Sequence, residues 1–221
     1  MAFGSIMQLK VGRLNIELAP LNKDVMGEFI RPGMQSVSIT KYLETKAKVL
    51  EDEYEWYEKV RTDSDSIVWG IWVIGGDERE LIGTSSLHNI KKDFFFEAGS
   101  GSLIFKNEYW GKGIASAIHQ ARTWYAFHVI GIDRIRSEVI QGNIASRRAL
   151  EKSGYYLTHV TRNSKFVEGR LHHMDQLECI NPGASIGNRW WGDDRPTKTA
   201  CEARLRTQDA MKWASKNVTL S

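Results

Sequence analysis

The chain of 221 residues contains little cysteine and little proline, with two and four residues respectively. Cys179 and Cys201 are too few for a disulfide framework, and no CxxC pair or cluster of cysteine with histidine indicates zinc. No apolar run reaches the ~18 residues that a membrane-spanning helix needs. Residues 1–13 contain no continuous apolar segment, so we expect no secretory signal. These absences predict a cytoplasmic protein with no membrane partner and no metal.

The charge of the chain is nearly balanced. Lysine and arginine number 30 and aspartate and glutamate 27, which gives a net charge of +3. Such a mild excess does not by itself indicate nucleic acid. Only the basic tail suggests a nucleic-acid-modifying enzyme, and binding that weakens steeply with salt would be its mark. With 42% hydrophobic residues, the chain has enough apolar material for one sizeable domain.

The hydropathy pattern predicts a mixed α/β protein. Expected strands cover residues 14–18, 66–74, 81–90 and 94–105, with two short helices in residues 22–42 and a longer helix over residues 49–61. Strand and helix then alternate, with helices over residues 112–129 and 143–152 and strands over residues 134–140, 155–160 and 171–179. Gly99 and Gly101 lie inside an expected strand, which indicates a bulge or a close approach to the backbone.

The most informative segment is LIFKNEYWGKGIA, residues 103–115. A strand leads into a turn that holds Gly111 and Gly113, and a helix begins at once. Unpaired N–H groups at a helix N-terminus can hold a pyrophosphate, and glycine lets the phosphates approach closely. Lys112 adds a positive charge. The segment matches neither a Walker A loop nor a GxGxxG fingerprint, so on its own it leaves both phosphate binding and a plain turn open.

A second motif is NIASRRALEKSGY, residues 143–155. Asn143 can cap the helix that follows, and its amide can also bond another amide. Ser146 lies near the same helix start, and Gly154 ends the helix. In isolation, the segment fits a capped helix with an ordinary serine better than a functional site.

Together, the two motifs resemble the GNAT superfamily of acyl-CoA-dependent N-acyltransferases, and most of all its branch of ribosomal-protein-alanine and spermidine acetyltransferases. The superfamily's loop, Arg/Gln-x-x-Gly-x-Gly/Ala, falls on residues 110–115, where Gly113 and Ala115 match and Trp110 replaces the first residue. The second motif matches at Asn143, Ser146, Glu151, Lys152, Gly154 and Tyr155. The resemblance covers about residues 14–178.

The resemblance implies a mixed, mostly antiparallel central sheet with flanking helices in a domain over residues 14–180, and a partly helical extension over residues 181–221. It implies acetyl-CoA as co-substrate, bound where two neighbouring strands splay apart. Backbone groups of Leu103, Ile104 and Phe105 would pair with the pantetheine arm. The implied pyrophosphate contacts are the backbone N–H groups of Gly111, Lys112, Gly113, Ile114 and Ala115. Asn143 would bond the pantetheine, and Ser146 is also counted with the cofactor-binding residues.

The implied reaction is direct attack of a neutral primary amine on the thioester in a ternary complex, which needs a base and an acid. Many members of the superfamily use a tyrosine as the acid where this chain has Leu150, so Ser146 is the candidate acid. Glu97 is the candidate base, and a solvated or salt-bridged carboxylate is the equal alternative. His88 fits a structural histidine better than a base, and Tyr155 fits core packing.

The acceptor is left open among a polyamine, an amino sugar and a peptide or protein N-terminus. The acids in residues 51–55 either steer a cationic acceptor or form a solvated helix face. Residues 199–215 predict a helix that packs on the core or on a second subunit of a homodimer, and Trp190 and Trp191 suggest a lid. The rival function is a non-catalytic acyl-CoA-binding sensor or scaffold of the same fold.

Overall fold

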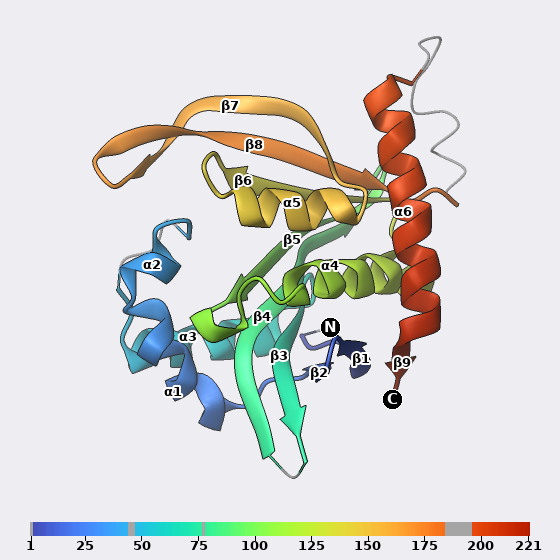
Figure 1. The fold of residues 1–221 in the computed structure, drawn as a ribbon. Coiled ribbons are helices and arrows are strands. Elements are labelled where there is room, and N and C mark those ends of the chain that lie inside the picture. Colours follow the sequence, from blue (N-terminus) through green and yellow to red (C-terminus); the bar gives the residue numbers. More distant parts are fainter. Residues whose placement is uncertain (1, 44–46, 77, 184–195) are drawn as a thin grey trace.

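The structure is a computed structural model that describes residues 2–43, 47–76, 78–183 and 196–221. In these ranges, one sheet contains nine strands in the order β7-β8-β6-β5-β4-β3-β2-β1-β9. Every neighbouring pair is antiparallel except β5 and β6, which are parallel. The predicted mixed, mostly antiparallel sheet with flanking helices is therefore confirmed (Figure 1).

Most elements correspond to predicted ones, while β1 and β9 were not predicted and β7 is longer than predicted. The strands are β1 Met7–Val11, β2 Leu14–Ala19, β3 Ile67–Gly75, β4 Glu78–Lys92, β5 Phe96–Ile104, β6 Arg134–Ile140, β7 Tyr156–Val167, β8 Arg170–Ile180 and β9 Val218–Leu220. The helices are η1 Lys23–Val25, α1 Met26–Glu28, η2 Phe29–Met34, α2 Val37–Thr40, α3 Leu50–Thr62, η3 Asn107–Tyr109, α4 Ile114–Trp124, η4 Tyr125–Ile130, α5 Ile144–Lys152 and α6 Lys198–Asn217. The predicted break among the first helices occurs at Arg31, which is extended (φ −125°, ψ 124°) because it precedes Pro32.

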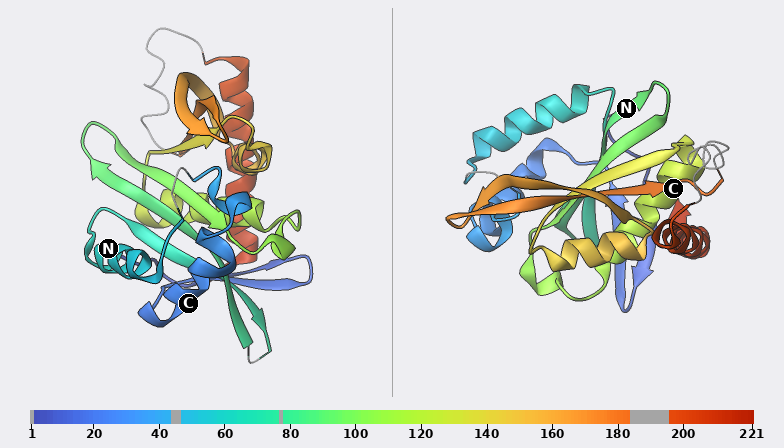
Figure 2. Two further views of the ribbon diagram at one scale, coloured as in Figure 1. Left: turned by 90° about the vertical axis from the view of Figure 1, so that its left-hand side faces the viewer. Right: turned by 90° about the horizontal axis from the view of Figure 1, so that it is seen from above.

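The sheet is covered on both faces, and each face has its own core. Figure 2 shows α3 on one face and α5 and α6 on the other. Ile114 and Ile118 of α4 pack with Trp69, which is fully buried. On the opposite face, Val60 of α3 packs with Phe105. Since alternate residues of a strand point to opposite faces, the continuous apolar run of β3 supplies both cores.

The C-terminal segment is part of this architecture. Helix α6 packs against α4, α5 and β8, and β9 extends the sheet by pairing with β1. The buried face of α6 consists of small residues: Ala200, Ala203, Thr207, Ala210 and Ala214. The prediction that the helix packs on the core is confirmed, whereas Leu205 lies outside its buried face and is 61% exposed. Trp190 and Trp191, suggested as a lid, lie outside the described residues.

Among the helices in the described ranges, none combines the length and the apolar character that crossing a bilayer requires.

Candidate active site

The parallel pair β5 and β6 opens after three residues. Glu97, Ala98 and Gly99 pair with Arg134, Ile135 and Arg136, and the two strands then separate. At the point of opening, Ser100 Oγ donates to the carbonyl of Arg136 at 3.2 Å, and Ser137 Oγ donates to the carbonyl of Ser100 at 3.3 Å. Beyond this point, β5 has no strand partner on the β6 side among the described residues, so a ligand can take that place.

At the end of β5, two of the three residues predicted to contact pantetheine already have backbone groups bonded within the protein. The N–H of Phe105 donates to the carbonyl of Ile82 at 2.9 Å, and the carbonyl of Ile104 accepts a hydrogen bond from Trp110 Nε1 at 2.9 Å. Because successive residues of a strand alternate in direction, the N–H of Ile104 points toward β6. That N–H is the group at the end of β5 that is best placed to bond a ligand in the gap.

The glycine turn leads directly into α4. Gly111 and Gly113 have φ values of +73° and +84°, a region that favours glycine. The N–H of Ala117 makes the first bond of the helix, to the carbonyl of Gly113, and in the described part of the chain no side chain caps this end. A Cβ at Gly113 would meet only Val11 Cγ1, at 3.9 Å. The uncapped N–H groups of α4 therefore face open space that can receive an anion.

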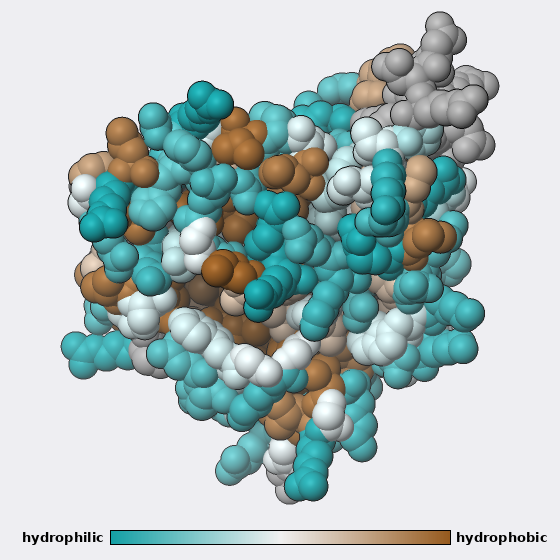
Figure 3. Space-filling model, turned by 45° about the horizontal axis from the view of Figure 1, so that its top comes forward, coloured by the Kyte–Doolittle hydropathy of each residue, from teal (hydrophilic) through white to brown (hydrophobic). Residues whose placement is uncertain are grey.

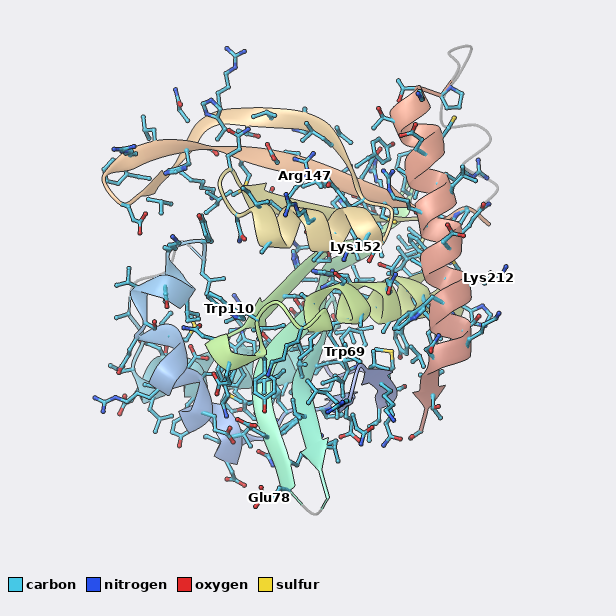
Figure 4. All side chains as sticks on the ribbon, in the orientation of Figure 1. Trp69, Glu78, Trp110, Arg147, Lys152 and Lys212 are labelled. Atoms are coloured by element: carbon cyan, nitrogen blue, oxygen red, sulfur yellow. The ribbon has the colours of Figure 1, made fainter. Side chains whose placement is uncertain are left out.

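Three contacts hold this turn to the sheet. Trp110 bonds the end of β5, as described above, and Figure 4 shows it on the loop before α4. Tyr109 Oη donates to Glu80 at 2.5 Å, which raises the pKa of Tyr109 to about 12, and Lys106 Nζ lies 2.7 Å from the same carboxylate. Trp110, which replaces the arginine or glutamine of the resembled motif, thus anchors the loop.

The second motif lies across the gap, at the start of α5. Asn143 Oδ1 accepts the N–H of Ser146 at 3.3 Å, so the predicted cap is confirmed. The amide nitrogen of Asn143 and the hydroxyl of Ser146 have no protein partner within the described ranges. Arg147 pairs with Asp175 of β8, which also accepts from Gln141 at 2.9 Å. This network fixes α5 and leaves the polar groups of the motif available to a ligand.

Glu97 is bound in an ion cluster. It pairs with Arg134, with Arg136 at 3.3 Å and with Lys91 at 3.3 Å, and it is 7% exposed. Burial alone would raise the pKa of Glu97, but Arg134 and the other two cations hold it below its ordinary value. A carboxylate in this state is a weak proton acceptor. The salt-bridged alternative therefore describes its surroundings better than the candidate base does.

We expect Glu97→Gln to destabilise the fold by about 2–4 kcal/mol at pH 7, because it removes the nearer of the two carboxylates, Glu97 and Glu178, that pair with buried Arg134. Since the pKa of Glu97 is lowered on folding, its contribution is complete above the ordinary value of 4.5 and is lost as the pH falls through the folded value. Chemical unfolding of both proteins from pH 7 to pH 3 should show a shrinking difference. Glu58→Gln, on the exposed face of α3, is the control, and an undiminished difference at low pH would contradict the ion-pair account.

The other candidate acids and bases are placed as follows. Leu150 is buried, as is Tyr155, whose Oη lies 3.4 Å from Ser100 Oγ. The prediction that Tyr155 packs in the core is therefore confirmed.

The described residues contain no group of three histidine, cysteine, aspartate or glutamate side chains that could hold a metal. The acids of α3 do not form one surface, since Glu51 and Glu55 are exposed and Glu53 is buried.

The space-filling view shows how the surface is shaped over one face. Figure 3 shows a hollow near its middle, where hydrophobic residues gather inside a mostly hydrophilic rim. A sheet that opens between two parallel strands, with an uncapped helix N-terminus after the strand that separates, is typical of the class of proteins that bind a long ligand with an anionic end.

Comparison with known proteins identifies this class. The family described as "Acetyltransferase (GNAT) domain" matches residues 15–156. The chain is 30% identical over 128 residues to "Probable N-acetyltransferase YjcK" of Bacillus subtilis (strain 168), which covers 58% of this chain and 68% of that protein. The chain therefore belongs to the GNAT acetyltransferase family and is an N-acetyltransferase.

Solved structures show the same fold at low sequence identity. A spermidine N-acetyltransferase from Vibrio cholerae, in complex with CoA and spermine, has a TM-score of 0.68 at 18% identity, over 75% of this chain and 95% of that one. Mycobacterium smegmatis RimJ, in complex with CoA-disulfide, has a TM-score of 0.70 at 15% identity, over 99% of this chain and 97% of that one. The likeness to RimJ thus extends over the C-terminal helix.

Proposed function

We propose that the protein transfers the acetyl group of acetyl-CoA to a primary amine by direct attack in a ternary complex. The observation that carries the proposal is the opening of β5 from β6 after Gly99, beside the uncapped end of α4. The acceptor is a small amine such as a polyamine or amino sugar, or a peptide N-terminus. The spermine and CoA bound by the Vibrio cholerae enzyme support a polyamine, and the CoA-disulfide of RimJ supports the cofactor.

In this proposal, each part of acetyl-CoA has a place in the site. The pyrophosphate lies against the N–H groups of residues 111–115, where the glycines leave room and the helix end attracts negative charge. The pantetheine arm lies between β5 and β6, bonded by the N–H of Ile104 and the amide nitrogen of Asn143. The thioester then reaches the point where the two strands separate.

Starting from the ammonium, the acceptor nitrogen loses two protons in the reaction and the sulfur gains one. The amine, once neutral, attacks the thioester carbonyl, the C–N bond forms, the C–S bond breaks, and the sulfur leaves as a thiolate that takes up a proton. Ser146 lies at the start of α5, beside the capping Asn143. Its hydroxyl is the group we assign to bond the departing sulfur.

The first experiment is calorimetric titration with acetyl-CoA, supported by a thermal-shift assay. At a ligand concentration about 100 times the dissociation constant, binding should stabilise the protein by about 2.7 kcal/mol. A panel of spermidine, glucosamine and a peptide that begins with alanine then tests for released thiol. Binding with no turnover of any acceptor would favour the sensor or scaffold, and no binding would refute the proposed cleft.

We expect Ser146→Ala to lower kcat by about tenfold to a hundredfold while the dissociation constant of acetyl-CoA changes less than about threefold. The reason is that the variant keeps the backbone N–H that Asn143 caps and loses only the hydroxyl. Ser146→Thr, which restores a hydroxyl, should recover part of the turnover. Equal losses in binding and turnover would make Ser146 a structural residue.

A further inference from the structure

The imidazole of His88 lies at the point where the cleft opens. A Cβ placed on Gly99 would come within 2.3 Å of His88 Cε1 and 2.7 Å of its Nδ1, so the ring packs directly against the Gly99 backbone. Gly99 is the last residue of β5 that pairs with β6. The close approach expected from a glycine in this strand is therefore made by a histidine side chain, and it occurs where the thioester of the proposed complex arrives.

A β-bulge sets the direction of His88. The register of β4 with β5 runs from His88 opposite Gly99 to Lys91 opposite Glu97, so β4 has one extra residue at this point. Asn89, in the bulge, has a φ of +51°, and its amide nitrogen lies 3.2 Å from His88 Nδ1. Bulges are frequent beside active sites, where they redirect a side chain. The bulge in β4 thus sets the direction of the His88 side chain.

A cavity reaches His88 from the face of the sheet opposite α4. Its volume is about 310 Å³, and its walls include Trp56 of α3, Asp63 at the end of α3 and Ser86 and His88 of β4. A Cβ on Gly101 of β5 would lie 3.4 Å from Ser86 Oγ, so the cavity borders β5 just beyond the opening. At ~30 Å³ per water molecule, the space admits a small polar molecule.

The surroundings keep the His88 ring neutral. Burial lowers the pKa of His88, and the charge of Arg122 on α4 lowers it further, whereas Glu138 on β6 and a backbone hydrogen bond at Ser100 raise it. Lys59 and Asp63 also face the cavity. The net direction is downward, so the imidazole is in the form that can accept a proton.

We propose that His88, and not Glu97, accepts the proton that the acceptor amine must lose, with the cavity beside Trp56 as the route by which a small amine reaches it. This assignment rests on the proposed function. The ammonium gives one proton to the imidazole, and the freed lone pair forms the C–N bond as the C–S electron pair leaves on sulfur. The second proton that the nitrogen then loses passes to the thiolate, which leaves the amide and the neutral thiol. The imidazolium then releases its proton to water through the cavity.

The test compares His88→Ala with His88→Gln, using the acceptor that the panel identifies. Both variants should lower kcat/KM by about a hundredfold or more, with the dissociation constant of acetyl-CoA within about threefold of the wild type. Added imidazole should restore part of the turnover of His88→Ala, because the deleted ring leaves a space for it beside Gly99. His159→Ala, at an exposed strand position, is the matched control. It should keep the wild-type kcat/KM, and added imidazole should not change its turnover.

Several outcomes would overturn the assignment. One is a folded His88→Ala that keeps turnover within about threefold. Another is a loss that imidazole does not restore and that comes with weakened acetyl-CoA binding, which would make His88 structural. A third is a folded Glu97→Gln that loses turnover when His88→Gln does not, which would return the role to Glu97. Wild-type protein that fails to bind acetyl-CoA would instead refute the proposed function, so the two failures are distinct.

Discussion

Gly113→Val is expected to weaken acetyl-CoA binding by about a hundredfold or more, which corresponds to about 2.7 kcal/mol of binding free energy. The substituted side chain would project from the residue before α4, where the proposal places the pyrophosphate. Apart from its chain neighbours, no described residue comes closer than 3.9 Å to the new Cβ, so the obstruction acts on the ligand and the surrounding protein keeps its packing. Calorimetric titration with acetyl-CoA measures the effect.

The backbone strain of this change has a matched control. Gly113 and Gly131 have the same φ of +84°, and valine at either position costs about 1–2 kcal/mol of stability. Gly131 ends η4, at the far end of the same helical segment, and a Cβ there meets nothing within 4 Å. Gly131→Val should therefore lose the same stability and keep full affinity. Equal affinity in the two variants would show that the turn does not hold the pyrophosphate.

The success of the sequence in predicting the fold depended on the strength of local patterns. Strand β6, Arg134–Ile140, was predicted with the observed bounds, because an apolar run lies between clear turn residues. Strand β1 was not predicted, although residues 7–11 alternate apolar and polar side chains and Gly12 (φ +59°) turns the chain into β2. This alternation and the glycine turn would have been enough to predict β1 from the sequence. Strand β9 has three residues, and only its pairing with β1 defines it, so no local pattern could have revealed it.

Prediction of the site was limited by contacts across the sheet. Asn143 was readable as a cap because its partner, the N–H of Ser146, is three residues away. The ion cluster joins Glu97 to residues up to 39 positions away, so the sequence did not reveal these ion pairs and Glu97 stayed a candidate base. His88 was read as a structural histidine, and its position against Gly99 depends on the register of two strands. Gly99 and Gly101 of β5 were the local feature of the sequence that indicated a close contact at this point.

The largest expected effect on stability is that of Gly154→Ala, which should destabilise the protein by about 3–5 kcal/mol. Gly154 (φ +91°) ends α5, and a Cβ there would lie 1.9 Å from Thr207 Oγ1 and 2.7 Å from the carbonyl oxygen of Ala203. The second contact is with the backbone of α6, which cannot rotate away. The methyl group must therefore displace α6 from its place against α4 and α5.

Gly131→Ala separates this displacement from backbone strain, since Gly131 also has a positive φ but faces open space. It should cost only about 1–2 kcal/mol. At about 2–4 °C per kcal/mol for a domain of this size, the melting temperature of Gly154→Ala should fall by roughly 6–20 °C, clearly more than that of the control. Equal losses would mean that α6 is docked loosely. The larger loss would show that α6 and the terminal strand stabilise the sheet that opens to form the cleft.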